Sequence, residues 1–371
     1  MTAASPTLPH RAGLLPDEAV RLLGHLGVDE RIGRKLLAQA VGHARTDLDG
    51  VTDVKKTTLR AIAEATTAAP LQIVERELAP DGFLKLLIEL PDGQRVETVR
   101  IPVPCEAPGA DLSAFEGKEK KYIVCVSSQV GCALACSFCA TGALGFTRNL
   151  SAAEIVGQVL AVKREADRPV RGVVFMGMGE PFLNYENVLR AAKILSHPSG
   201  GAIDGRAITI STAGIVPGIR RFTAEGHKHR LAVSLTQATP KKRLPLMPIE
   251  RVHPTEELVA ALHDHAKARR TRVLVEYVLL GGVNDAPEDA VALTKLLDPK
   301  LVKLDLIDVN GGVGGYARST REARSRFLDV LAGDGGLPFG IRYSGGQDVA
   351  AGCGQLAAGE LGRAPGPRIA P

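Results

Sequence analysis

Three cysteines with the spacing Cys132-x3-Cys136-x2-Cys139 follow an apolar run at residues 122–126. This spacing is typical of a loop that wraps around three corners of a cubane iron–sulfur cluster. Three thiolates leave the fourth iron without a protein ligand, so that a substrate or cofactor can bind it. Two alternatives are a structural zinc ion, which would require a fourth ligand to complete its tetrahedron, and three unrelated core cysteines.

Two further segments carry groups that could do chemistry. Gly177-Met178-Gly179-Glu180-Pro181 follows another apolar run. Its glycines would let the backbone approach a ligand, and its carboxylate could accept hydrogen bonds from an ammonium group. Taken alone, the segment is more typical of a tight turn in which Glu180 caps a helix. Late in the chain, Cys353-Gly354-Gln355-Leu356 places another thiol in a loop rich in glycine and alanine.

Together with the string around the three cysteines, which begins at Cys125, these segments resemble the RlmN/Cfr family of radical S-adenosyl-L-methionine (SAM) RNA methyltransferases. The resemblance covers roughly residues 20 to 357. It implies a 4Fe-4S cluster on Cys132, Cys136 and Cys139, with SAM bound to the open iron. The residues that it assigns to SAM binding are Gly179, Glu180, Ser211, Ser234, Leu235, Thr236 and Asn310. Thr236 stands where the family usually has a histidine.

The resemblance assigns catalysis to Cys353, Cys125 and Glu97. Cys353 would receive a methyl group from one SAM molecule, and a radical formed from a second SAM would then activate that group for addition to an adenine carbon. Cys125 would resolve the resulting thioether through a transient disulfide with Cys353, and Glu97 would accept a proton. Without the resemblance, Cys125 is typical of a small buried side chain, and Glu97 of the solvated face of an edge strand.

The implied substrate is C2 of an adenine in 23S ribosomal RNA (rRNA), and in some members transfer RNA (tRNA), with a flavodoxin or ferredoxin as the electron donor. A member that methylates C8 is one alternative. A diverged paralog with another RNA substrate is a second, since Thr236, the long stretch at 103–121 and residues 345–348 depart from the family pattern. A non-enzymatic RNA-binding protein with a structural cluster is a third, although such a protein would need neither Cys125 nor Cys353.

Composition limits the class of protein further. The 371 residues are 45% hydrophobic, which is ample for a packed core, and the net charge of +5 permits an RNA partner without establishing one. Six cysteines in a chain of this length are not a disulfide scaffold, and reactive thiols need a reducing compartment. No signal peptide and no membrane-spanning run are evident, so we expect a cytoplasmic monomer.

The rhythm of strand and helix from residue 122 onward predicts an α/β fold, an incomplete parallel (β/α)6 radical SAM barrel with a small N-terminal helical domain and a short β extension. In such folds the working residues lie at the carboxyl ends of the strands. The predicted strands are 122–127, 172–176, 207–211, 231–235, 273–280 and 303–308, and the predicted helices are 152–165, 186–196, 255–269 and 287–297.

The predicted organisation has five parts. These are a disordered N-terminus at 1–14, an RNA-gripping helical domain with its β extension at 15–101, a loop insertion at 102–121, the barrel with its C-terminal reactive-cysteine loop at 122–357, and a flexible tail at 358–371. The basic residues expected to grip RNA are Arg31, Arg34, Lys35, Lys55, Lys56 and Arg60, and further basic runs occur at 241–243 and 269–272.

Overall fold

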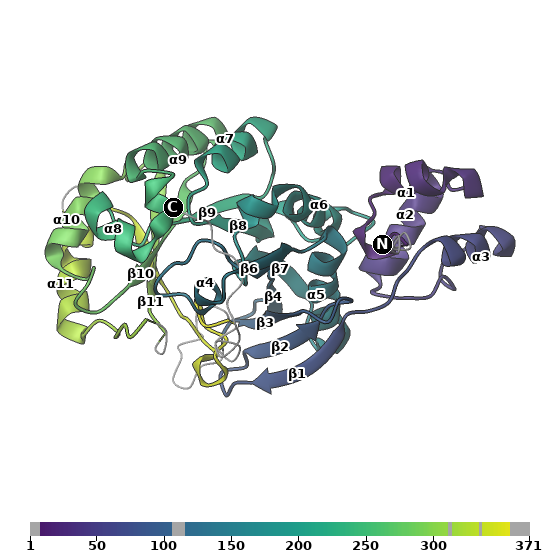
Figure 1. Cartoon of the computed structure of the whole chain (residues 1–371), viewed down its shortest axis with the longest axis horizontal. Coiled ribbons are helices and arrows are strands. Elements are labelled where there is room, and N and C mark those ends of the chain that lie inside the picture. Colours follow the sequence, from purple (N-terminus) through teal and green to yellow (C-terminus); the bar gives the residue numbers. More distant parts are fainter. Residues whose placement is uncertain (1–7, 106–115, 311–313, 334–335, 357–371) are drawn as a thin grey trace, which may run out of the picture.

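A single ten-stranded sheet forms the centre of the molecule in the computed structural model, which describes residues 8–105, 116–310, 314–333 and 336–356 (Figure 1). The sheet has the order β1-β2-β3-β4-β7-β8-β9-β10-β11-β12. Its parallel strands are β4 (Lys121–Cys125), β7 (Val170–Phe175), β8 (Ile208–Thr212), β9 (Arg230–Ser234), β10 (Val273–Leu279), β11 (Val302–Asp308) and β12 (Phe339–Arg342). The predicted α/β fold with a partial parallel barrel is confirmed, and β12 adds a seventh parallel strand. Within the described residues, β1 and β12 are unpaired edges, so the barrel stays open.

Helices connect successive parallel strands and cover the outside of the sheet (Figure 1). They are α5 (Ala152–Glu165), α6 (Tyr185–Ser196), α7 (Val216–Glu225), α8 (Pro240–Leu246), α9 (Thr255–Arg269), α10 (Pro287–Leu296) and α11 (Arg321–Ala332). The first of them starts with a capping box, in which Ser151 Oγ accepts from the Glu154 N–H and the Glu154 carboxylate accepts from the Ser151 N–H. The four helices predicted from periodicity agree with α5, α6, α9 and α10 to within one residue at each end.

The β extension belongs to the same sheet as the barrel. Its strands β1 (Gln72–Leu78), β2 (Leu84–Glu89) and β3 (Arg95–Val103) are antiparallel, and β3 pairs antiparallel with β4. In that ladder Val99 lies opposite Cys125. Because β3 has a neighbour on each side, Glu97 is buried in the middle of the sheet. The alternative interpretation of Glu97, as a solvated residue of an edge strand, is therefore wrong.

The small helical module comprises α1 (Pro16–Leu23), α2 (Glu30–Leu37) and α3 (Lys56–Ala65), and it lies beside α5 and α6 (Figure 1). It has a core of its own, made of Ala19, Leu23, Val28, Ile32, Leu36, Val51 and Ile62. The segment before it, Arg11–Gly13, is buried against α5. This close approach needs glycine at position 13, because an added Cβ there would lie only 2.9 Å from the Ala153 Cβ. The prediction of disorder is thus wrong for residues 10–13.

Several predicted boundaries lie in or next to segments outside the described residues. Residues 1–7 and 106–115 and the predicted tail at 358–371 are among these segments. The ends of the predicted insertion at 102–121 belong to strands, since β3 continues to Val103 and β4 begins at Lys121. Among the residues that the structure does describe, no helix combines the length and the apolar character needed to cross a bilayer.

A fully buried guanidinium fastens the ends of two barrel strands to each other. Arg243 of α8 donates to the Leu235 carbonyl (3.1 Å) beyond β9, to the Ala213 carbonyl (2.9 Å) beyond β8, and to Glu250 Oε2 (2.6 Å). A buried cation is tolerated only when it is paired and hydrogen-bonded in this way. Arg243 is therefore a structural residue, and the basic run at 241–243 does not present three cations to an RNA.

We expect Arg243→Ala to lower the free energy of unfolding by about 3–5 kcal/mol, because the substitution leaves the Glu250 carboxylate buried without its counter-charge. Urea unfolding followed by circular dichroism measures this change. The matched control is Arg60→Ala, which removes an exposed ion pair with Glu64 (3.0 Å) and should cost less than about 1 kcal/mol. Equal losses for the two variants would contradict the role given to Arg243.

Candidate active site

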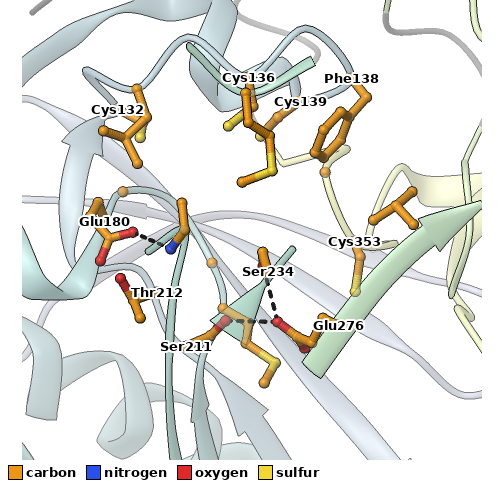
Figure 2. Close-up of a pocket in the computed structure, with 18 of the residues that line it drawn as sticks. Cys132, Cys136, Phe138, Cys139, Glu180, Ser211, Thr212, Ser234, Glu276 and Cys353 are labelled. Atoms are coloured by element: carbon orange, nitrogen blue, oxygen red, sulfur yellow. Dashed lines mark hydrogen bonds between the residues drawn. The ribbon is translucent and has the colours of Figure 1, made fainter. Parts of the chain in front are cut away.

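A pocket opens at the carboxyl ends of the parallel strands, where the barrel fold predicts the working residues (Figure 2). The three cysteines lie along one side of it, and strand-end hydroxyl and carboxylate groups lie on the other side. The residues to which the resemblance gives a site role and which line this pocket are Cys132, Cys136, Cys139, Gly179, Glu180, Ser211, Ser234 and Cys353. Segments far apart in the chain therefore form one site.

The cysteine loop takes its shape from the hairpin of β5 (Gln129–Gly131) and β6 (Phe146–Asn149). At Gly131, with φ of 73°, an added Cβ would lie 1.9 Å from the Gly145 carbonyl oxygen, so only glycine fits there. The Cys132 N–H donates to the same carbonyl at 2.8 Å. These contacts curve the loop so that its three thiols face the pocket.

The donor set fits a cubane cluster better than a zinc ion. Burial and the neighbouring Cys139 raise the pKa of the Cys136 thiol to about 12, and burial together with Cys136 and Cys139 also raises that of Cys132. The thiols are thus close enough to influence one another's ionisation. Among the described residues, however, no group of three or more His, Cys, Asp or Glu side chains is placed to hold one metal ion. Three thiols that line one pocket could hold three corners of a cubane, whose fourth iron would stay open, whereas a zinc ion would lack its fourth ligand.

The Glu180 loop packs directly on the start of the cysteine hairpin. Gly179 has a φ of 100°, and an added Cβ would lie 2.5 Å from the Gln129 Cβ, so the close approach requires glycine. The Glu180 carboxylate accepts from the Phe182 N–H (2.9 Å) and the Ala213 N–H (2.8 Å). Helix capping is therefore present, as the simpler interpretation predicted. Each carboxylate oxygen can accept a second hydrogen bond, so the cap leaves capacity for an ammonium group.

A charged network that the sequence analysis missed underlies the two serines. Ser211 Oγ (2.7 Å) and Ser234 Oγ (3.2 Å) both donate to Glu276 Oε2, and Arg342 Nη1 donates to Glu276 Oε1 (2.9 Å). Arg342 also pairs with Asp305. Although burial lowers the pKa of Arg342, its anionic neighbours raise it above the ordinary value, so the guanidinium stays charged. The signal in the sequence was one carboxylate, Glu276, inside the apolar run of β10.

Cys125 and Cys353 meet at a second cavity inside the barrel, which Arg342 and Met176 also line. Burial raises the pKa of the Cys125 thiol to about 12, and the nearby Cys353 adds to the effect. Cys353 is exposed as a residue, but the protein atoms around its thiol desolvate it and raise its pKa as well, whereas Arg342 opposes that rise. Since Met176 and Cys353 line both cavities, Cys353 lies between the pocket with the three cysteines and the cavity with Cys125.

Three residues assigned to SAM binding lie outside the pocket lining. Leu235 and Thr236 are fully buried, and the Thr236 Oγ1 has no hydrogen-bond partner in the part of the chain that the structure describes. Asn310 instead supports the reactive-cysteine loop, because its Nδ2 donates to the Cys353 carbonyl (3.1 Å) and to Ser344 Oγ (2.7 Å). These placements assign Asn310 to the support of Cys353.

Glu97 is tied to the active-site loops through its backbone. Its N–H lies 3.4 Å from the Met178 Sδ, and its carbonyl accepts from Ser127 Oγ at 2.6 Å. Its carboxylate forms an ion pair with Lys85 (3.5 Å) and lines neither of the two cavities described above. The structure thus places Glu97 beside the loop of Met178 and Glu180, but not on the pocket surface.

A further residue that the sequence gave no reason to select is Gln158 of α5, which is fully buried. Its Oε1 accepts from the Ser127 N–H (2.8 Å) and Thr98 Oγ1 (2.6 Å), and its Nε2 donates to the Ser127 carbonyl (3.0 Å). The hydroxyl of Ser127 in turn accepts from the Met178 N–H at 2.9 Å. Gln158 therefore positions the segment that links β4 to the cysteine loop.

Burial raises the pKa of Glu180 from 4.5 to about 7, which predicts a dependence of stability on pH. The folded protein without cofactors binds more protons than the unfolded chain between these two values, so its free energy of unfolding decreases as pH rises through this window. Glu180→Gln should abolish up to roughly 3 kcal/mol of that decrease. Urea unfolding of the metal-free protein at several pH values tests this, with the exposed Glu256→Gln as control. A wild-type slope retained in Glu180→Gln would refute the assignment.

Known proteins share this sequence and this fold. Residues 126–294 match the model of the Radical SAM superfamily. A probable RNA methyltransferase of Myxococcus xanthus is 48% identical over 346 residues, which cover 91% of each chain. A probable dual-specificity RNA methyltransferase RlmN of Moorella thermoacetica is 39% identical over 93% of this chain and 96% of its own.

A solved structure extends the agreement to three dimensions. The radical SAM methyltransferase from Sphaerobacter thermophilus superimposes with a TM-score of 0.83 at 37% identity, covering 94% of this chain and 99% of that one. The similarity therefore includes the barrel, the β extension and most of the helical module. With the cysteine loop, the Glu180 loop and Cys353 brought to one site, the chain belongs to the RlmN/Cfr family of radical SAM RNA methyltransferases.

Proposed function

We propose that this radical SAM RNA methyltransferase acts on C2 of an adenine in 23S rRNA, with tRNA as a second substrate, through a methylated Cys353. The observation that carries the proposal is the placement of Cys353 between the pocket with the three cysteines and the cavity with Cys125. A radical enzyme that acted directly on its substrate would need neither of these two thiols. The relatives named as dual-specificity RNA methyltransferases support the pair of substrates.

The pocket residues divide between the two cofactors, the 4Fe-4S cluster and SAM. Cys132, Cys136 and Cys139 would hold the cluster, which supplies the electron that cleaves SAM when it is bound. Glu180 would accept hydrogen bonds from the ammonium group of SAM. Ser211 and Ser234, already oriented by a shared carboxylate, would donate to or accept from its ribose hydroxyls.

Arg342 lies close to both reactive thiols and favours their ionised forms. It lowers the pKa of Cys353 and of Cys125 against the rise caused by burial. In the first step, the Cys353 thiolate would attack the methyl carbon of SAM, and the S-adenosylhomocysteine sulfur would leave with the electron pair. In the last, the Cys125 thiolate would attack the Cys353 sulfur. A disulfide would form between Cys125 and Cys353, and the bond between the Cys353 sulfur and the transferred carbon would break. That carbon, which is already joined to the base, would keep the electron pair of the broken bond and then take up a proton.

The proposal extends to partners and compartment. An electron donor such as flavodoxin or ferredoxin would reduce the cluster, and free thiols at Cys125 and Cys353 require a reducing compartment such as the cytoplasm. We propose a monomer, because residues of one chain line the whole pocket that the three cysteines share with Cys353.

The helical module is proposed to contact RNA through a smaller set of cations than the sequence indicated. Arg34 pairs with Glu30, Lys35 with Asp53 and Arg60 with Glu64. Such exposed pairs neutralise charge that would otherwise face a phosphate. Within the described residues, Arg31, Lys55 and Lys56 have no ion-pair partner at 4.0 Å or less, so these three cations would be the module's main contacts.

Single alanine substitutions at Cys132, Cys136 and Cys139 should abolish the iron content and the brown absorbance of anaerobically purified protein, because each removes one of three iron ligands. Iron analysis and visible spectroscopy measure this. Cys353→Ala is the matched control and should retain the iron. Stoichiometric zinc without iron in reconstituted wild-type protein would be incompatible with the assigned cluster.

Substitution of the two reactive thiols should give opposite defects. Cys353→Ala should bind the cluster and still cleave SAM, yet transfer no methyl group to RNA, because the carbon carrier is gone. Cys125→Ala should accumulate RNA covalently attached to Cys353, because the resolving thiol is gone. Peptide mass spectrometry should also find one added methylene on wild-type Cys353. An unmodified Cys353 in the wild-type protein, together with full activity of the Cys125→Ala variant, would contradict the proposed mechanism.

A further inference from the structure

The base of the barrel, at the opposite end from the active site, carries a cluster of cations in one cavity. The cavity lies where strands β8 to β11 begin, and none of its fourteen lining residues is acidic. Six exposed basic residues line it, and we call them the barrel-base cluster: Arg206, Lys228, Arg230, Arg270, Arg272 and Lys303. The run at 269–272, noted in the sequence, is thus one part of a larger feature.

The parallel fold itself gathers these cations. Arg230 is the first residue of β9, Lys303 the second of β11, and Arg272 immediately precedes β10. Since the amino ends of parallel strands lie at the same edge of a sheet, side chains near each strand start converge there. The cluster could not be recognised in the sequence, because it combines residues from four separate segments.

Among the described residues, no carboxylate forms an ion pair with the cluster, although Lys303 acts on Asp305 from a longer distance. Across the ranges that the structure describes, none of its six cations lies within 4.0 Å of a carboxylate oxygen, whereas Arg34, Lys35 and Arg60 of the helical module are all paired. Like charges held together in this way repel each other and weaken the compact state. Without close ion pairs in the described residues, these six cations are available to an external anion.

We propose that the barrel-base cluster binds the sugar-phosphate backbone of the RNA substrate, at a distance from the methylated base. This inference rests on the proposed function, because it extends the same RNA across the molecule. Four of the six cations are arginines, whose planar guanidinium groups can bind phosphate oxygens through two parallel hydrogen bonds. Phosphates repeat along any RNA, so the contact would add affinity and orientation rather than base specificity.

The position of the cluster favours RNA over an acidic protein partner. The seven residues of β10 span about 23 Å at the usual strand rise, so the cluster lies roughly one barrel length from the cysteine loop. An electron-donor protein bound there would hold its redox group far from Cys132, Cys136 and Cys139. A folded RNA larger than a single stem-loop can reach both ends of the barrel, and phosphate contacts impose no such distance limit.

The test is the salt dependence of RNA binding by the double variant Arg270→Asp/Arg272→Glu. Arg270 has a φ of 50°, in the left-handed region. Aspartate is chosen as its replacement because aspartate tolerates this region better than most residues. The probe is large-subunit rRNA transcribed in vitro. We expect about tenfold weaker binding, and a slope of log affinity against log salt that is reduced in magnitude by about two, one for each lost phosphate contact.

The matched control is Arg220→Glu/Arg326→Glu, which changes the net charge equally on the exposed faces of α7 and α11. It should alter affinity by less than about twofold, since only long-range charge is changed. A second cluster variant, Arg206→Gln/Lys228→Gln, removes charge without reversing it and should shift affinity and slope in the same direction as the first. It keeps the test decisive if the charge-reversed protein does not fold.

Three outcomes separate the alternatives. Unchanged affinity and salt slope in both cluster variants would overturn the barrel-base proposal, even while wild-type protein methylates the rRNA. Absence of methyl transfer to any RNA by reconstituted wild-type protein would instead overturn the proposed function, independently of the binding data. A third outcome is normal RNA binding by the barrel-base variants together with slower reduction of their 4Fe-4S cluster by flavodoxin. It would assign this surface to a protein partner and also overturn the proposal.

Discussion

The side-chain amide of Gln158 lies where three active-site segments meet. It satisfies both backbone groups of Ser127, whose hydroxyl joins the Glu97 carbonyl to the Met178 N–H. All of these groups are buried, so a lost partner would leave a backbone group unsatisfied at a cost of about 1–3 kcal/mol. The end of β4, the loop of Glu180 and strand β3 thereby share one fixed reference point. These hydrogen bonds therefore help to fix the positions of Cys125 and the cysteine loop.

A second constraint is electrostatic and lies inside the barrel. Asp305, Arg342 and Glu276 form a continuous ionic chain that ends on the hydroxyls of Ser211 and Ser234. In a low-dielectric interior, such a chain is stable only when each charge has its partners. The Arg342 guanidinium also lies near the two reactive thiols. The orientation of the Ser211 and Ser234 hydroxyls and the ionisation of the thiols therefore depend on the same arrangement of charges.

The parts predicted correctly from the sequence depend on local signals. The spacing of Cys132, Cys136 and Cys139 and the alternation of apolar strands and amphipathic helices are encoded within short windows, so the partial barrel and most of the pocket followed from them. Glu276 and Arg342 were missed because a pair formed across two strands has no signature in either strand. Gln158 was missed for the same reason, since its partners come from β3 and the segment after β4.

The errors also have physical causes. The edge position that Glu97 was expected to have without the family resemblance is not observed, because β3 gains a second neighbour through its long-range pairing with β4. The family motif assigns SAM contacts to Leu235 and Thr236, and these contacts stay predictions, since both side chains are buried, neither lines the pocket, and Thr236 has a positive φ of 58°. Disorder was predicted for residues 1–14, which are rich in proline and alanine, whereas Gly13 packs closely against Ala153 of α5.

The separate core of the helical module has an evolutionary consequence. Its seven buried side chains share no member with the barrel core among the described residues, and a polar contact between Glu18 and Arg190 is part of what joins the two. The two cores are nevertheless joined through α2, because Leu36 belongs to the module core and Leu37 to the barrel core. A substitution that shifts this helix would therefore disturb both cores, so the module can vary freely in sequence only at positions away from α2.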